Sequence, residues 1–317
     1  MINKIWNYFF GLKKPQFHEL ENSNKICKLC GTNAELKESH IVPKSIYKWI
    51  KDTSATGYFR NLKNPNVRLQ DGLKMYLLCE NCEQKFGIYE KWFKEKIFLK
   101  AVEQNNLEPI PLTFNYDDKL FYFILSVWWR TIQFSLDDKE LQQSKYWKLL
   151  LRCEKELRDY LHNNHYPKKF DKIYLVSTGY VKDAPPEYKR LNAFFTRDIR
   201  PFIMFDNESC FFSLKIPCLW FFGNLTGIDE KKIIHADISP TGGLFSTEEL
   251  ILKEPHILNF MQQQIHVAHE KSKEISDKQQ QIILKDIQKN PKRFAESKSA
   301  EAMRLDNLRE SELGKDE

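Results

Sequence analysis

The chain has 317 residues, of which 42% are hydrophobic and 14% aromatic, so it can bury a sizeable core in one large domain or two. No apolar run approaches the roughly 20 residues that a membrane-spanning helix needs, so we expect no transmembrane segment. The net charge is +6, and residues 1–103 hold 18 Lys/Arg and 11 Asp/Glu, so this first third carries the whole positive surplus. Phosphate binding is mainly electrostatic, which makes this segment the candidate nucleic-acid-binding part; a solvated lysine-rich surface is the alternative.

Residues 1–12 are aromatic but lack a small-residue cleavage site, which favours a docking helix or strand over a signal peptide; a membrane-surface anchor is the alternative. Seven cysteines without a signal peptide indicate a reducing compartment and metal ligation rather than disulfides. We therefore expect a cytoplasmic protein. Three of these cysteines lie in apolar or helical surroundings and are predicted to be buried packing residues: Cys153, Cys210 and Cys218.

Two Cys-x-x-Cys pairs, Cys27 with Cys30 and Cys79 with Cys82, bracket His40. Four thiolates are enough to close a tetrahedral zinc site with no open position, which is the arrangement of a structural zinc. Any chemistry must then lie beside the metal. An imidazole titrates near neutral pH, so His40 is the candidate general base.

The residue pattern around these cysteines predicts several short elements. They are a hairpin with residues 26–31 and 36–42 as its arms, a short helix over 45–50, a polar inserted loop over 52–72, a strand over 74–78, and a helix from about 83 to 104. Along that last helix, Glu83 and Glu90 fall on one edge of the apolar stripe. Gly87 lies between them, either for close approach of a phosphate or backbone or as a tolerated packing site.

The cysteine pairs and the run from His40 to Pro43 resemble the HNH endonucleases (ββα-metal, or His-Me finger, family) in their version with a four-cysteine zinc site, over about residues 25–95. The resemblance implies a β-hairpin and a helix held by structural Zn²⁺ on Cys27, Cys30, Cys79 and Cys82. It also implies His40 as general base, Pro43 as the end of that strand, and a catalytic Mg²⁺ or Mn²⁺.

The chain departs from the family pattern at the predicted catalytic cation site. Ser39 stands where the family has an Asp or His ligand, and Glu83 stands where it favours His or Asn. Glu83 is nevertheless the first candidate ligand, since a carboxylate binds hard cations. Glu38, two residues before His40 on the same strand face, and Glu90 are the other candidates. The family's central Asn matches any of three residues: Asn61, Asn64 or Asn66.

The rest of the chain is predicted to be helical at first, then rich in short strands, and finally helical again. Residues 105–118 form a linker, residues 120–136 and 144–162 form helices, and short strands follow at 173–177, 193–195, 202–205, 210–215, 218–222 and 233–236. Trp128 and Trp129 are predicted core residues, with Arg130 either ion-paired or reaching toward phosphate. From about residue 247 the chain is helical, and beyond residue 291 it is predicted to be a solvated helix or disordered. His266 and His269 are predicted to be surface residues rather than a metal pair.

These patterns predict an α+β fold with a zinc-bound ββα-metal module (1–104), a helical connector (105–170), a β-rich antiparallel region (171–246) and a C-terminal helix with a polar tail (247–317). The leading hypothesis is a metal-dependent endonuclease acting on nucleic acid, with DNA favoured over RNA. By analogy alone, HNH domains fused to long unrelated regions indicate a bacterial defence or mobile-element effector whose C-terminal half binds a protein partner. One alternative is a catalytically inactive zinc module that binds nucleic acid or protein, and another is a structural subunit.

Overall fold

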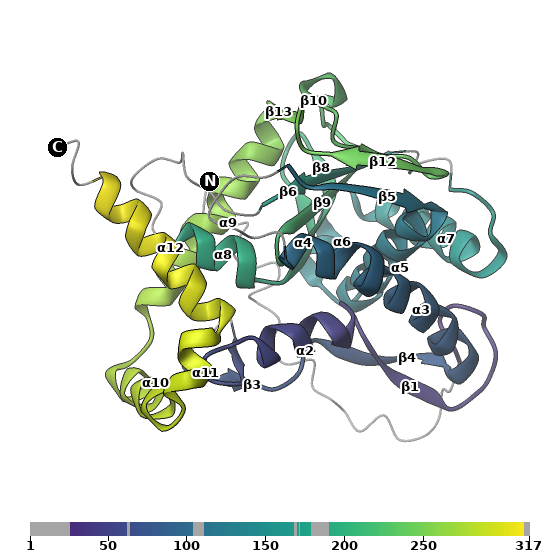
Figure 1. Cartoon of the computed structure of the whole chain (residues 1–317). Helices are drawn as coiled ribbons and strands as arrows, with labels where there is room; N and C mark the ends of the chain where they lie inside the picture. Colours follow the sequence, from purple (N-terminus) through teal and green to yellow (C-terminus); the bar gives the residue numbers. More distant parts are fainter. Residues whose placement is uncertain are drawn as a thin grey trace.

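The fold is described from a computed structural model that covers residues 26–61, 64–103, 111–167, 170, 172–178 and 190–313. Helices and antiparallel strands are both present throughout, so the α+β class is confirmed (Figure 1). The predicted docking segment at residues 1–12 lies outside the described residues. No helix in the described ranges is long and apolar enough to cross a membrane.

The cysteine-bearing part is built on two strands that are distant in sequence. Strand β1 (Leu36–His40) pairs antiparallel with β4 (Lys74–Cys79), and helix α3 (Glu80–Phe93) follows β4 without a loop. The connection between the two strands holds helix α2 (Lys44–Asp52) and the short pair β2 (Phe59–Arg60) and β3 (Arg68–Leu69).

The predicted hairpin between residues 26–31 and 36–42 is wrong in its first arm. Ile26 forms only an isolated bridge with Asn33, and residues 27–31 form a tight turn in which Gly31 N donates to Cys27 O at 2.9 Å. The turn has a physical reason, because two cysteines three residues apart can reach one metal only if the backbone curls between them. An extended arm would point their side chains apart.

A five-stranded antiparallel sheet lies beside this part, in the strand order β11-β6-β9-β8-β7. Its members are β6 (Ile173–Ser177), β7 (Arg200–Phe205), β8 (Cys210–Ile216), β9 (Leu219–Thr226) and β11 (Asp237–Ile238). Nearly every residue of β8 and β9 is buried, which explains why both strands are mostly apolar. Alternate residues of β9 belong to two cores: Leu219 and Phe221 face one, Trp220 and Phe222 the other.

Helices cover both faces of this sheet. Helix α5 (Asp118–Ser135) lies on one face, where the Trp128 ring approaches the backbone at Gly223 so closely that a Cβ there would lie 2.4 Å from the ring. Helices α8 (Leu191–Arg197) and α9 (Pro255–Lys273) supply Phe194 and Phe260 to the core on the other face. The first core continues from α5 into α3, where the rings of Phe93 and Phe123 stack at 3.8 Å. The cysteine-bearing part therefore shares its core with the sheet.

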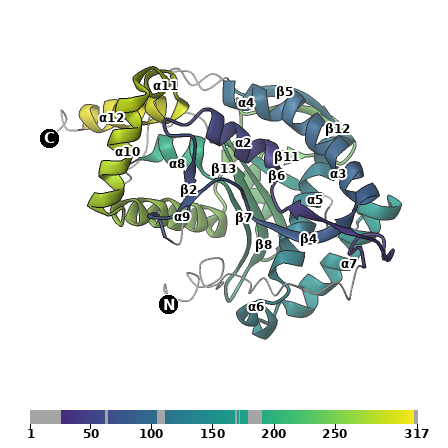
Figure 2. The same ribbon diagram turned by 90° about the horizontal axis from the view of Figure 1, so that it is seen from below.

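The remaining elements complete the fold (Figure 2). They are the π-helical turn η2 (Lys94–Phe98), α4 (Leu99–Glu103), β5 (Thr113–Asp117), α6 (Lys139–Gln143), α7 (Trp147–Asn163), η3 (Glu230–Lys232), β10 (Ile233–Ile234), β12 (Gly242–Ser246), β13 (Ile251–Leu252), α10 (Asp277–Lys289), α11 (Pro291–Glu296) and α12 (Lys298–Leu313). Of these, α7 adds Leu150, Leu157 and Leu161 to the first core. In the predicted linker, β5 is a strand, because it pairs with β12 over all five residues.

Two further predictions are corrected by tertiary packing. Residues 193–195 are helical rather than a strand, because the Asp306 carboxylate accepts hydrogen bonds from the first backbone N–H groups of α8, at Asn192 and Ala193. Beyond residue 291, α11 (Pro291–Glu296) buries no residue and fits the predicted solvated helix, but α12 is packed: it buries Ala300 and Leu305 and lies against α8. The apolar periodicity is weak because the buried residues of α12 include charged Asp306 and Arg309 beside Ala300 and Leu305.

Candidate metal centre and the His40 site

The four cysteines come together where the turn at residues 27–31 meets the start of α3. Their sulfur atoms all lie within 4.8 Å of one another, and the Sγ atoms of Cys30 and Cys79 are 3.8 Å apart. Zn–S bonds of about 2.3 Å in a tetrahedron place the sulfurs about 3.8 Å apart. Cys27, Cys79 and Cys82 are buried and Cys30 is half-buried. The donor set therefore fits a closed zinc site.

Two of the four thiols need a bound cation to lose their protons near neutral pH. Burial, reinforced by the neighbouring thiols, raises the pKa of Cys82, and burial raises that of Cys27 as well. Without a positive charge these buried groups stay protonated, and a divalent cation reverses that preference. Because Cys82 follows β4 within the first turn of α3, a metal bound here fixes the angle between strand and helix.

His40 is the last residue of β1, and its ring is hydrogen-bonded to a residue that sequence reasoning missed. The His40 Nε2 atom lies 2.7 Å from Asp71 Oδ1, with 14% of the His40 side chain exposed. Burial works to raise the pKa of Asp71, but hydrogen bonds from His40 and the Gly72 N–H outweigh it, and the pKa is lowered. Asp71 is therefore ionised near neutral pH and can only accept. The hydrogen on Nε2 is then donated to Asp71, which leaves Nδ1 as the free basic nitrogen of the neutral ring.

The loop that carries Asp71 is held firmly in place. Lys51 Nζ donates to Gln70 O at 2.6 Å, and Ile41 N donates to Leu73 O at 2.9 Å. Gly72 lies against the buried ring of Tyr47, where a Cβ would come within 2.0 Å of ring carbon Cε2. The Asp71-Gly72 dipeptide just before a predicted strand indicates a turn. It is the local sequence feature that could have drawn attention to Asp71.

Glu38 is placed on the same strand face as His40, as predicted from its spacing. Its carboxylate is paired with Lys74, whose Nζ lies 2.5 Å from Glu38 Oε2 and 3.5 Å from Asp71 Oδ2. Lys74 stands opposite His40 in the strand register. Glu38, Lys74, Asp71 and His40 thus form one chain of polar contacts on the outer face of the β1–β4 pair.

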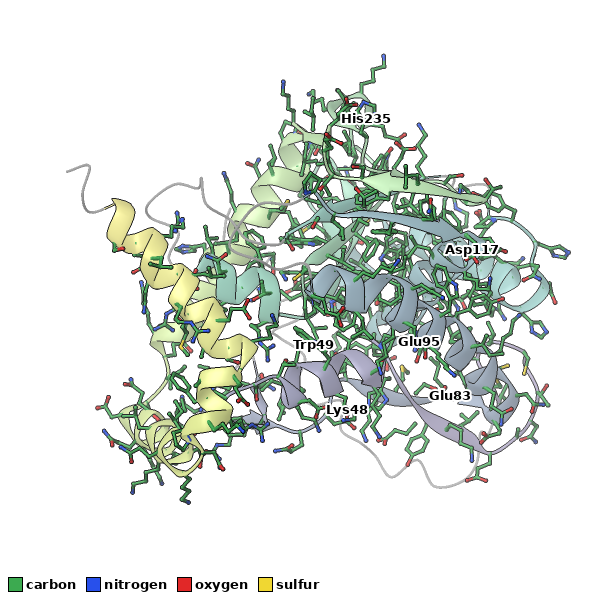
Figure 3. The ribbon with its side chains drawn as sticks, in the orientation of Figure 1. Lys48, Trp49, Glu83, Glu95, Asp117 and His235 are labelled. Carbon is green, nitrogen blue, oxygen red and sulfur yellow. The ribbon has the colours of Figure 1, made fainter. Side chains whose placement is uncertain are left out.

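Ser39 points the other way, toward α3. Its hydroxyl is fully buried and donates to Glu83 Oε2 at 2.6 Å. Figure 3 labels Glu83 in the region between α3 and the β1–β4 pair. The structure therefore brings together Ser39 and Glu83, which are 44 residues apart in the sequence.

Glu90 lies two turns further along α3 and is bound by Arg130. Burial raises the pKa of Glu90, while the guanidinium of Arg130 opposes this effect. Arg130 is 1% exposed, and its NH1 group donates both to Glu90 Oε1 and to the backbone oxygen of His40, at 2.7 Å each. Of the two roles predicted for Arg130, the structure places it in an internal ion pair.

Each of the candidate cation ligands Glu38, Glu83 and Glu90 is thus hydrogen-bonded or ion-paired to a different partner. Across the described ranges, the four cysteines are the only group of three or more His, Cys, Asp or Glu residues that could share an ion. His266 and His269 accordingly form no such group with a third residue there. Two of the three candidate carboxylates face a lysine or an arginine, and only Glu83 faces a neutral partner.

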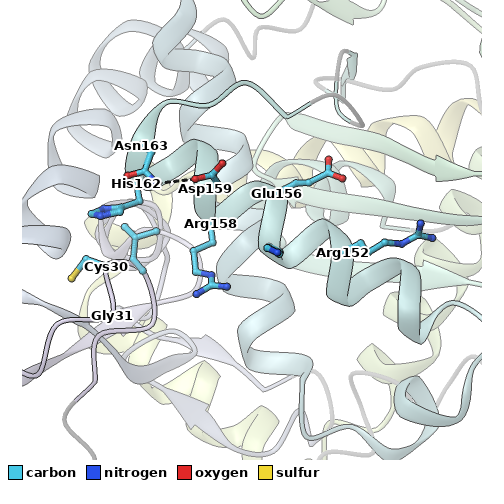
Figure 4. A pocket seen from close by; sticks show the side chains of 10 residues that line it. Cys30, Gly31, Arg152, Glu156, Arg158, Asp159, His162 and Asn163 are labelled. Atoms are coloured by element: carbon cyan, nitrogen blue, oxygen red, sulfur yellow. Dashed lines mark hydrogen bonds between the residues drawn. The ribbon is translucent and has the colours of Figure 1, made fainter.

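A cleft of about 660 Å³ lies on the far side of the cysteine turn (Figure 4). Cys30 and Gly31 form one wall, and the outer face of α7 forms the other with Arg152, Lys155 and Arg158. The cleft is lined by neither His40 nor Asp71, so it is separate from the site described above.

Comparisons with models of protein families, with curated proteins and with solved structures found no match for this chain.

Proposed function

We propose that the chain is a metal-dependent endonuclease of the HNH type that hydrolyses phosphodiester bonds, most readily in DNA. The observation that supports it best is the His40–Asp71 pair. It lies at the end of a strand whose partner, β4, leads directly into two of the four clustered cysteines. A general base needs a fixed ring and a free nitrogen, and Asp71 provides both conditions.

The chain's own residues perform the proton transfer in this mechanism. His40 Nδ1 takes a proton from a water molecule as the water oxygen forms a bond to phosphorus and the P–O bond to the leaving sugar oxygen breaks. Asp71 holds the opposite ring nitrogen and stabilises the imidazolium that results. Arg130 donates a hydrogen bond to the backbone oxygen of His40 and so fixes the main chain that carries the imidazole ring.

Glu83 is the residue we assign to the catalytic cation, with Ser39 beside it. Magnesium is often bound by one or two carboxylates, with waters and substrate phosphates completing its shell, so a single protein carboxylate is compatible with Mg²⁺ or Mn²⁺. A bound divalent ion supplies charge that stabilises the leaving oxygen. Glu38 and Glu90 are weaker candidates, because Lys74 and Arg130 neutralise them.

A second candidate function is a zinc module that binds nucleic acid without cutting it. The specific observation in its favour is the pairing of Glu38 and Glu90 with cations, which leaves one carboxylate for a metal. The two functions differ in a single measurable property, namely cleavage.

The deciding experiment is a nicking assay on supercoiled plasmid and on RNA with Mg²⁺ or Mn²⁺, comparing wild type with His40→Ala. Losing a positioned general base costs about 10²- to 10⁴-fold in rate. His266→Ala, at an exposed histidine of α9, is the matched control and should cut like wild type. Glu83→Ala should also cut more slowly, with partial recovery at high Mn²⁺.

Zinc content is measured on every variant. Binding of nucleic acid without cleavage by the wild type would favour the inactive module. Loss of zinc from His40→Ala would overturn the assignment of His40 as a base, because four cysteines already complete the zinc shell.

A further inference from the structure

Helix α2 begins four residues after His40 and carries lysines at one-turn intervals. Lys44, Lys48 and Lys51 are spaced by four and three residues, so they form one stripe along the helix, here named the lysine stripe. The opposite face of α2 is buried through Ile46, Tyr47 and Ile50. In Figure 3 Lys48 lies on the lower side of α2 and Trp49 on the upper side.

The stripe is connected to the His40 site at both ends. Lys44 is the first residue of α2, directly after the Pro43 that follows β1. At the other end, Lys51 Nζ donates to Gln70 O, one residue from Asp71. The stripe therefore runs beside the loop that positions the proposed general base.

The lysine stripe contributes little to the stability of α2 itself. A lysine in the first turn of a helix meets the positive end of the helix dipole, and α2 has neither an acidic residue in that turn nor a capping side chain. Lys44 makes no ion pair with any residue the structure describes. Lys48 is 67% exposed and paired with Asp52 at the surface, where solvent screening leaves such a pair little effect on stability. A sequence that breaks a local stability rule without an internal gain points to a ligand.

We infer that the lysine stripe binds the phosphate backbone of a nucleic acid and directs it to His40. This inference rests on the proposed function, which it deepens by assigning the substrate-binding surface. Lys44 and Lys48 contact phosphates, while Lys51 ties the stripe to the Asp71 loop. Contacts to phosphate carry no sequence information, so binding here is independent of sequence and strongly dependent on salt.

The experiment measures binding of a labelled DNA duplex by fluorescence anisotropy over a series of NaCl concentrations. The full chain carries His40→Ala, and no divalent ion is added, so cleavage does not interfere. Lys44→Gln and Lys48→Gln are tested singly and together. Each lost phosphate contact should reduce the slope of log K against log salt by about 1, so the double variant should lose about 2.

Lys231→Gln is the matched control for the change in net charge. Lys231 is exposed in η3, next to β10, which lies at the opposite side of the molecule from α2 in Figure 1. The slope of log K against log salt for Lys231→Gln should equal that of the parent chain, which carries His40→Ala alone. Zinc content and urea midpoints of all variants should be unchanged, because the substituted side chains are exposed.

An unchanged slope for the double variant, or an equal loss with Lys231→Gln, would overturn the inference. These outcomes are separable from failure of the proposed function. In one outcome, wild type cuts plasmid while the double variant shows an unchanged slope of log K against log salt. That result refutes DNA binding by the lysine stripe and supports the nuclease activity. If the double variant loses its slope while wild type never cuts, the stripe stands and the nuclease is wrong.

Discussion

Replacing Gly72 with alanine tests how the Asp71 loop is held against α2. The added Cβ would lie 2.0, 2.3 and 2.5 Å from three carbons of the Tyr47 ring. Carbon atoms pack comfortably at about 3.5–4.0 Å, so the ring or the loop must move by about 1.5 Å. Tyr47 is 6% exposed and stacks on Phe59 with ring centroids 5.4 Å apart, so the ring has little room.

Two consequences follow from this collision. Overpacking of a core typically costs about 1–3 kcal/mol, so Gly72→Ala should lower the free energy of unfolding by that amount. Displacing the neighbouring Asp71 also releases His40, and a misplacement of about 1 Å near a catalytic group can cost about 10²-fold in rate. Urea unfolding gives the first quantity and plasmid nicking the second.

Gly87→Ala is the matched control, because it makes the same chemical change on a glycine of α3. No atom lies within 4 Å of the Cβ it would add, so the variant should be stabilised by about 1 kcal/mol, the difference in helix propensity. A urea midpoint for Gly72→Ala equal to that of wild type would refute the steric reasoning. Full stability with lost cleavage would instead place Gly72 in the chemistry itself.

Three further predictions concern the charged and metal-binding groups. We expect elemental analysis of wild type to give one zinc per chain, and Cys79→Ser should lose it and unfold the β1–β4 and α3 part, because structural zinc contributes folding free energy directly; zinc retained at full stoichiometry would contradict the four-cysteine site. Arg130→Met should destabilise by about 3–5 kcal/mol in urea, since Glu90 is left unpaired, and adding Glu90→Leu should recover most of that loss; no recovery would mean that the bond to His40 O dominates. Folding lowers the pKa of Asp71 from its ordinary value of 3.8. The ionised carboxylate therefore stabilises the fold at pH values above 3.8, and this stabilisation is lost as the pH falls through the lower pKa of the folded chain. Asp71→Asn should therefore be less stable than wild type at pH 7, with a difference that shrinks below about pH 4, and a constant difference across this range would contradict the pair.

The sequence alone located the features that depend on short-range spacing. Two cysteines three residues apart fit one turn, and two such turns predicted a four-sulfur cluster that the structure assembles. Likewise, the stripe of Phe86 and Phe93 predicted the buried face of α3, because helical periodicity is a local property. Largely apolar runs predicted β8 to within one residue at its end and the start of β9 to within one residue, since both faces of that sheet are covered, but the prediction ended β9 four residues early, at 222 instead of Thr226.

Pairings between distant residues were decided by the tertiary structure. Asp71 is 31 residues from His40 and Arg130 is 40 residues from Glu90, and no spacing rule links such residues before the elements are packed. The same reason explains the miss at residues 193–195, where Asp306 from the C-terminal helix caps α8 and overrides the strand preference of the two phenylalanines. Local patterns fix which residues can serve a site, whereas packing decides which partner each one receives.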